Sequence, residues 1–237
     1  MSKNKRYFIC IIFLLLLSNL SCAQDNETKY KRERELMIKI QIENRGIKDT
    51  TVLSAMREVP RHIFVPELYR MFSYEDRPLP IGYGQTISQP YIVALMTKLL
   101  KLNKDSKALE VGTGSGYQAA ILSEIVKEVY TIEIIEELYL RTNKVLEKAG
   151  YDTIKTKFGD GYYGWEEYAP YDAIIVTCTA EFVPPPLIKQ LKIGGIMCIP
   201  VGPPFRVQNL LVITKKSEEL IETEVITQVR FVPLIRK

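Results

Sequence analysis

Histidine is almost absent from this chain, because His62 is the only one among 237 residues. A single imidazole excludes a histidine-rich metal centre and leaves little material for a hydrolytic triad, and no Cys or His cluster has metal-ligand spacing. Cysteine is also sparse: Cys10, Cys22, Cys178 and Cys198 are the only four. The last two lie in strand-like apolar stretches. We therefore expect them to be buried free thiols, and we expect no bound metal.

An excess of charge of one sign is missing as well. The formal net charge is +4, but three of the 32 basic residues, Lys3, Lys5 and Arg6, lie at the extreme N-terminus. Without the first 23 residues the chain has 29 basic and 28 acidic side chains. Because basic and acidic side chains are nearly equal in number, the composition gives no sign of a basic surface for nucleic acid, and we predict no such partner. The content of hydrophobic residues, 46%, is ordinary for one globular domain with short extensions.

The first 23 residues have the pattern of an export leader. Basic residues precede an apolar run at residues 7–17, and Ser21-Cys22-Ala23 supplies small residues before Gln24. Cleavage after Ala23, lipidation of Cys22 and a retained anchor are the three interpretations, and we favour lipidation. We therefore expect an exported protein, either periplasmic or attached to the envelope membrane through Cys22.

Translation from Met37 is the alternative, and it would give a cytoplasmic protein. Residues 24–35 are polar and are predicted to form a tether between the leader and the folded domain. The domain itself is predicted to span residues 36–237.

A glycine-rich turn lies between a predicted strand and a predicted helix. Its sequence is Glu110-Val111-Gly112-Thr113-Gly114-Ser115-Gly116-Tyr117, after the strand-like residues 107–109 and before the helix-like residues 118–126. About 20 residues later a second strand ends in Glu133, where a carboxylate can accept hydrogen bonds from a ribose diol. This order predicts a nucleoside-cofactor site. The alternative is a tight turn with an unremarkable exposed Glu133.

The spacing of the glycines indicates the class of cofactor. A dinucleotide-binding fingerprint, G-x-G-x-x-G, would need glycine where Tyr117 stands, and no lysine follows the turn as in a phosphate-binding loop. Both observations disfavour the common nucleotide motifs. The form E-x-G-x-G-x-G resembles instead the first motif of the S-adenosylmethionine-dependent methyltransferases.

A polar loop at residues 78–90 precedes a predicted helix at residues 91–100. The loop ends in Gln85-Thr86-Ile87-Ser88-Gln89-Pro90. Hydroxyl and amide groups near a helix N-terminus are suited to holding an anion, whereas a Ser88 that only caps the helix is the alternative. The local sequence leaves both open.

Predicted strands and helices alternate along the rest of the chain. Helices are expected at residues 49–56, 136–149 and 186–191, strands at residues 154–158 and 171–177, and an antiparallel pair at residues 208–214 and 224–232. This alternation predicts a parallel sheet covered on both faces. Since ligands bind at the carboxyl ends of such strands, residues 112–116, Glu133, Asp160 and Thr177 should share one rim.

Taken together, these motifs resemble the protein-L-isoaspartate O-methyltransferase family. The resemblance covers nearly everything after residue 35, and its most discriminating part is Gly-Gln-Thr-Ile-Ser-Gln-Pro at residues 84–90. It implies an α/β, Rossmann-like methyltransferase fold with a mostly parallel sheet, helices on both faces and a C-terminal antiparallel pair. It also implies that S-adenosyl-L-methionine donates a methyl group to the α-carboxyl of L-isoaspartyl residues in damaged proteins. A same-fold methyltransferase of another substrate class and a non-catalytic envelope protein are the alternatives.

The resemblance also implies roles for individual residues. Ser88 is the catalytic position, Thr86 and Ile87 shape the same substrate loop, and Gln208 faces the substrate. The residues implied to bind the cofactor are Glu110, Gly112, Thr113, Gly114 and Gly116 at its methionine end, Glu133 at its ribose, and Asp160 and Gly161 at its adenine. A carboxylate acceptor is already ionised at neutral pH and needs no general base, which agrees with the shortage of histidine. We expect a monomer.

Overall fold

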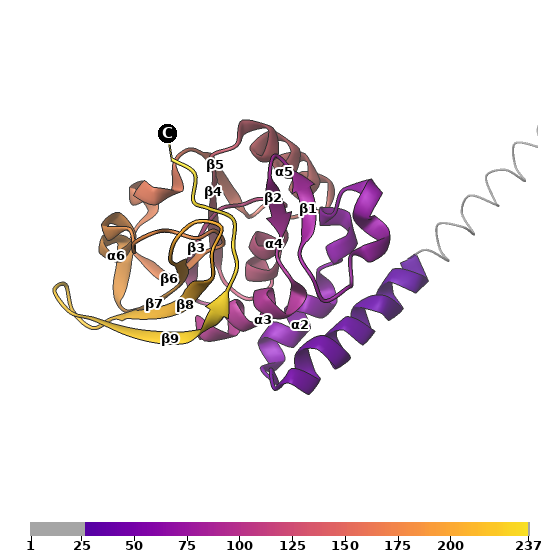
Figure 1. Ribbon diagram of the computed structural model, residues 1–237, viewed down its shortest axis with the longest axis horizontal. Coiled ribbons are helices and arrows are strands. Elements are labelled where there is room, and N and C mark those ends of the chain that lie inside the picture. The colour runs from indigo at the N-terminus through magenta and orange to yellow at the C-terminus, as the bar shows by residue number, and fades with distance from the viewer. Residues whose placement is uncertain (1–26, 237) are drawn as a thin grey trace, which may run out of the picture.

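A seven-stranded sheet in the order β5-β4-β3-β6-β7-β8-β9 forms the centre of the computed structural model, which describes residues 27–236 (Figure 1). Its strands are β3 (Lys107–Val111), β4 (Glu128–Glu133), β5 (Lys155–Phe158), β6 (Tyr171–Val176), β7 (Leu191–Val201), β8 (Gln208–Lys215) and β9 (Ile221–Val229). The strands from β5 to β7 pair in parallel, whereas β8 is antiparallel to both β7 and β9. The predicted mostly parallel sheet with a C-terminal antiparallel pair is therefore confirmed.

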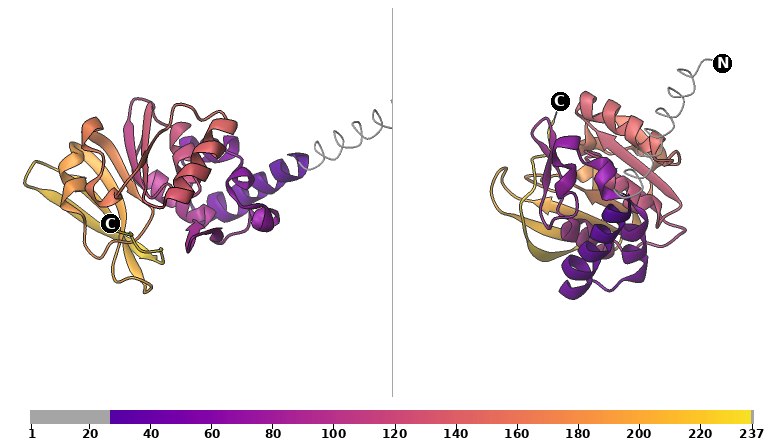
Figure 2. Two further views of the ribbon diagram at one scale, coloured as in Figure 1. Left: turned by 90° about the horizontal axis from the view of Figure 1, so that it is seen from above. Right: turned by 90° about the vertical axis from the view of Figure 1, so that its right-hand side faces the viewer.

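Each face of the sheet has its own hydrophobic core, because successive residues of a strand point to opposite sides. On β3 and β6, for example, Ala108 and Ile175 belong to one core, whereas Leu109 and Ile174 belong to the other. The first core is covered by α3 (Pro90–Leu99), α4 (Tyr117–Ser123), α5 (Glu136–Lys148) and the N-terminal helices. The second is covered by α6 (Pro185–Gln190) and by aromatic residues of the β5–β6 connection, which contains the short helices η5 (Gly161–Tyr163) and η6 (Glu166–Tyr168). The sheet thus has helices on both faces, and Figure 2 shows their arrangement in two further views.

The N-terminal helices pack against the first face of the sheet. Residues 27–37 are helical and continue into η1 (Ile38–Ile42) and η2 (Glu43–Arg45), and α2 (Thr50–Glu58), η3 (Arg61–Phe64) and η4 (Glu67–Phe72) follow. Asp49 caps α2 by accepting a hydrogen bond from the backbone N–H of Val52 at 3.0 Å, as the sequence predicts. Among residues 27–236, no helix is both long and apolar enough to cross a membrane.

The predicted polar tether at residues 24–35 needs correction where the structure describes it. Tyr30, Arg34 and Met37 recur at helical spacing on one side of the first helix, so that this side packs on the domain although most of the segment is charged. The Tyr30 ring stacks on His62 with 4.0 Å between the ring centres. The leader, its cleavage site and Cys22 lie outside the described residues.

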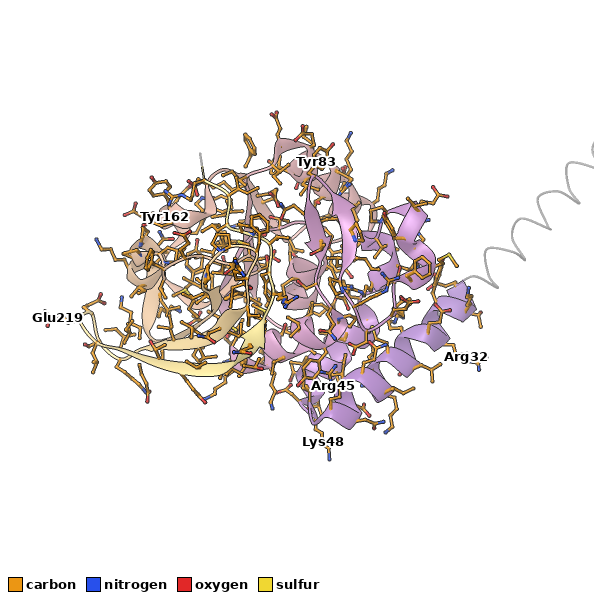
Figure 3. The ribbon with its side chains drawn as sticks, viewed as in Figure 1. Arg32, Arg45, Lys48, Tyr83, Tyr162 and Glu219 are labelled. Atoms are coloured by element: carbon orange, nitrogen blue, oxygen red, sulfur yellow. The ribbon has the colours of Figure 1, made fainter. Side chains whose placement is uncertain are left out.

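The loop predicted at residues 78–90 contains a β-hairpin. Its strands are β1 (Leu79–Gly82) and β2 (Gln85–Ile87), with Tyr83 at the turn between them (Figure 3). Arg141 of α5 donates a hydrogen bond from Nη2 to the Ile81 carbonyl oxygen at 2.6 Å. Ile87 is buried in the first core. The hairpin therefore has a fixed position relative to α5.

Candidate active site

A cleft lies at the carboxyl ends of β3, β4 and β6, where the sequence places the common rim. Its wall is formed by the hairpin, by the turn after β3, by the ends of β4 and β6, and by the C-terminal segment. The lining residues of these parts include Thr86, Ile87, Ser88, Glu110, Gly112, Thr113, Gly114, Glu133, Gly161, Thr177, Cys178 and residues 232–235. Most of the sequence-predicted cofactor residues are thus brought together in one place.

Two glycines of the turn after β3 line the cleft, and the third has a different position. Gly112 and Gly114 have positive φ angles of 98° and 52°. A Cβ atom on Gly112 would come within 2.7 Å of Thr177 Oγ1. Gly116 is absent from the cleft wall and instead caps α4 with a φ of 86°, where a Cβ atom would lie 2.7 Å from Thr142 Cγ2 of α5. Gly116 therefore allows α4 and α5 to pack closely.

Glu133 joins the turn after β3 to the end of β4. Its Oε2 accepts a hydrogen bond from the Gly114 N–H at 2.7 Å, and its Oε1 accepts from the N–H groups of Ile134 and Ile135, both at 2.9 Å. Burial raises the pKa of this carboxyl, and the three N–H donors oppose the rise. An ionised carboxylate offers about four lone-pair sites, so Glu133 retains capacity for a ligand hydroxyl in the cleft.

Glu110 is a fully buried acid in the wall of the cleft. Its Oε2 accepts a hydrogen bond from Thr131 Oγ1 at 2.6 Å, and the Thr131 hydroxyl also lies 2.7 Å from that of Thr113. Its Oε1 has no hydrogen-bond partner among the described residues. Burial raises the pKa of Glu110 to about 8. Because a nearby positive charge favours the ionised form of an acid, a cationic ligand group beside this unpaired oxygen would lower the raised pKa, and S-adenosylmethionine carries positive charge at its methionine end.

Asp160 lies beside the cleft, and only its neighbour Gly161 contributes to the lining. Asp160 caps η5, since its Oδ1 accepts from the Tyr162 N–H at 3.0 Å, and its Oδ2 accepts from Arg236 Nε at 2.8 Å. A Cβ atom on Gly161 would lie 2.5 Å from Val111 Cγ1. Glycine is therefore required where the chain leaves β5 and passes over β3.

Ser88 lies between the cleft and a second cavity of about 600 Å³. Thr86, Ser88, Thr177 and Val232 line both spaces. The alternative that Ser88 caps the following helix is wrong, because Gln89 is the N-cap of α3 and no side chain makes a capping hydrogen bond there. The Ser88 side chain is half-buried and lies where the two cavities meet.

Gln208 does not line either cavity, in contrast to its predicted position at the substrate. Its side chain is buried, accepts a hydrogen bond from the Phe231 N–H at 2.9 Å and donates one to the Pro203 carbonyl oxygen at 3.2 Å. It thereby fixes the chain where it leaves β9. The strand predicted at residues 224–232 ends at Val229, so residues 232–235 are free to enter the cleft wall, which the sequence pattern did not indicate.

The histidine and the two described cysteines are buried, and of the three only Cys178 lines the cleft. His62 is buried, lies 2.8 Å through Nδ1 from the Tyr74 hydroxyl and lines neither cavity. Cys178 and Cys198 are buried free thiols, as predicted, and burial raises the pKa of each. Within the described part of the chain, no group of three His, Cys, Asp or Glu side chains is placed to hold a metal ion.

Comparison with known proteins agrees with this geometry. The family model described as Protein-L-isoaspartate(D-aspartate) O-methyltransferase (PCMT) matches residues 31–237. Protein-L-isoaspartate O-methyltransferase 2 of Shewanella sediminis is 50% identical over 234 residues, which are 99% of this chain and 96% of that protein.

Two solved structures are also similar. One is a protein-L-isoaspartate O-methyltransferase with 31% identity and a TM-score of 0.77; the match covers 84% of this chain and 65% of that longer one. The other, a Plasmodium falciparum protein assigned to the same enzymes and solved with S-adenosyl-L-homocysteine, has 27% identity, a TM-score of 0.74 and coverage of 86% and 99%. The family match over residues 31–237 and the near-complete alignment with a half-identical relative show that this chain belongs to the protein-L-isoaspartate O-methyltransferase family.

Proposed function

We infer that the chain transfers the methyl group of S-adenosylmethionine to the α-carboxyl of L-isoaspartyl residues in damaged proteins. The observation that carries this inference is the meeting of two cavities at Thr86, Ser88 and Thr177. A group transfer needs a donor site and an acceptor site that open onto each other, so that nucleophile and electrophile can be aligned.

The cleft is suited to the donor. When bound, S-adenosylmethionine supplies a methyl group on a positively charged sulfur. In this proposal the unpaired oxygen of Glu110 would face the cationic methionine end, whose charge favours the ionised form of this acid. Glu133 would accept from the ribose hydroxyls, and Gly161 would lie at the adenine. The turn at Gly112 and Gly114 leaves the backbone free of side chains where the ligand approaches.

The second cavity is suited to a carboxylate acceptor. Among the described residues that line it there is no acid and no histidine, and its charged residue is Arg230. An amine or hydroxyl acceptor would need a general base to remove a proton, whereas a carboxylate with a pKa near 4 does not. This property favours protein repair over methylation of a small molecule or RNA. Ser88 then positions the incoming carboxylate with its hydroxyl.

Transfer of labelled methyl to an isoaspartyl peptide and to its normal aspartyl twin tests the proposal. We expect labelling of the isoaspartyl peptide alone. Labelling of both would indicate a carboxyl methyltransferase without repair specificity. Binding of S-adenosylhomocysteine without labelling of either would indicate another substrate class, and no binding would indicate a non-catalytic protein.

We further propose export of the protein, with lipidation of Cys22, and a monomeric state. Packing of Tyr30 on His62 supports a start upstream of Met37, since a start at Met37 would remove this contact. Mass spectrometry of the native N-terminus distinguishes a lipid-modified Cys22, a free Gln24, an uncleaved Met1 and a start at Met37. Light scattering of the purified protein tests the monomer.

A further inference from the structure

The C-terminal segment, residues 230–236, forms one wall of the cofactor cleft. After β9 the Phe231 N–H is held by Gln208, the Thr179 N–H donates to the Val232 carbonyl oxygen, and the Leu234 N–H donates to the Thr179 carbonyl oxygen, the last two at 2.8 Å. Residues 232–235 line the cleft, and Val232 also lines the second cavity. In Figure 1 the segment rises in yellow from the end of β9 towards the carboxyl ends of β4 and β5.

Arg236 ties the far end of this segment to the end of β5. Its Nε donates to Asp160 Oδ2 at 2.8 Å, and its guanidinium carbon lies 3.5 Å from the centre of the Tyr162 ring, whose position Figure 3 labels. The side chain of Asp160 is only 10% exposed, whereas that of Arg236 is 41% exposed. The arginine therefore covers the carboxylate from the solvent side.

We propose that Arg236 is a positioning residue for the cofactor, which holds the end of the C-terminal segment, beyond Leu234, at the cleft through its contacts with Asp160 and Tyr162. The inference rests on the proposed use of S-adenosylmethionine. A carboxylate has about four lone-pair sites, so Asp160 can accept from Arg236 and retain capacity for an adenine amino group. The bound cofactor and the Arg236 contacts then stabilise each other, because each favours the same position of the end of the C-terminal segment.

The contact between Arg236 and Asp160 fixes the end of the chain locally and contributes little to the stability of the whole domain. An exposed ion pair adds little to the stability of a whole domain, since solvent screens it and the side chains lose freedom. Loss of the ion pair between Arg236 and Asp160 releases only the residues after Leu234, because Gln208 still holds Phe231 and Thr179 still holds Val232 and Leu234. The effect of removing Arg236 should therefore appear in cofactor binding rather than in unfolding.

Titration of the full chain with S-adenosylhomocysteine tests this role. We expect Arg236→Ala to weaken affinity roughly 5- to 30-fold, mainly through faster dissociation in stopped-flow measurements. Arg236→Lys should restore part of the affinity, because it keeps the charge but loses the planar stack on Tyr162. The KM for S-adenosylmethionine should rise, whereas the KM for isoaspartyl peptide at saturating cofactor should not.

Lys216→Ala is the matched control. It removes another exposed ion pair, to Glu222 at 2.7 Å in the β8–β9 hairpin, and should leave affinity unchanged. Equal affinity of wild type and Arg236→Ala would overturn the proposal. So would a fall in the melting temperature of the ligand-free Arg236→Ala protein well beyond that of Lys216→Ala, since this would indicate a general structural role. A wild-type protein that binds no S-adenosylhomocysteine would instead contradict the proposed function.

Discussion

Replacing Glu110 by glutamine should change how the stability of the protein depends on pH. Glu110 is fully buried on β3, and the Thr131 hydroxyl donates to its Oε2. Glutamine has the same shape, and its amide oxygen can accept the same hydrogen bond. The substitution therefore removes the titration of this site while it leaves the packing almost unchanged.

The size of the effect follows from the pKa. Burial raises the pKa of Glu110 from its ordinary value of 4.5 to about 8, so between these pH values the folded protein holds a proton that the unfolded chain has released. The contribution of this carboxyl to stability is complete below pH 4.5 and is lost as the pH rises to about 8. Each pH unit in this interval lowers the free energy of unfolding by about 1.4 kcal/mol. Between pH 5 and pH 8 the loss amounts to roughly 3 to 4 kcal/mol.

Urea unfolding of the wild type and of Glu110→Gln at pH 5, 6, 7, 8 and 9 measures this term. The difference between the two free energies removes the titration of all other groups. We expect the variant to gain roughly 3 to 4 kcal/mol relative to the wild type between pH 5 and pH 8, with no further gain above pH 9. Glu128→Gln is the control for which we expect little change over this interval: the hydrogen bond from Tyr130 lowers the pKa of Glu128 from its ordinary value of 4.5, so this carboxyl is largely ionised in both the folded and the unfolded protein from pH 5 upward. A constant difference between wild type and Glu110→Gln from pH 5 to 9 would refute a buried neutral Glu110.

Three further substitutions test the roles of site residues. Ser88→Ala should lower turnover of isoaspartyl peptide about 3- to 10-fold, which is the scale of one hydrogen bond. The affinity for S-adenosylhomocysteine, measured by calorimetry, should be unchanged. Wild-type turnover would contradict the positioning role of Ser88. Gly116→Ala should lower the free energy of unfolding in urea by about 1–3 kcal/mol, because residue 116 has a positive φ and the added Cβ would clash with Thr142 Cγ2. The double variant with Thr142→Ser, which lacks this methyl group, should recover part of the loss. No recovery would show that the clash is unimportant. Gln208→Leu leaves the Phe231 N–H unpaired and should lower the free energy of unfolding by about 1–3 kcal/mol. A raised KM for peptide at unchanged stability would indicate instead that Gln208 contacts the substrate.

The centre of the main sheet could be predicted from the sequence, because β3, β4 and β6 are mostly buried runs separated by helices. Regular alternation determines the architecture through the geometry of parallel pairing. The β1–β2 hairpin could not be predicted in the same way. Its strands have four and three residues, and Pro78, Pro80, Gly82 and Gly84 are typical of a loop. Segments this short contain too few residues to show a period of two.

The rim of the site could also be predicted, whereas the directions of individual side chains could not. The ends of β3, β4 and β6 meet because parallel strands end on the same edge, so Gly112, Glu133 and Thr177 lie together. Asp160 shares that edge, but its carboxylate is held by Arg236, which is 76 residues away in the chain. Gln208 likewise faces Phe231 because of how β9 ends. Such contacts depend on tertiary structure that no local pattern records.

The shortage of histidine, and so of side chains suited to act as a general base, has a consequence for substrate selection. The α-carboxyl of isoaspartate and the side-chain carboxyl of normal aspartate are both ionised at neutral pH, so ionisation cannot distinguish them. Discrimination must come from where the carboxylate lies relative to the peptide backbone, and this depends on the loop at Thr86 and Ser88. Burial of Ile87 and the hydrogen bond from Arg141 to the Ile81 carbonyl oxygen fix the position of that loop. The rigidity of the hairpin is therefore what allows a site without a general base to select between two carboxylates of equal charge.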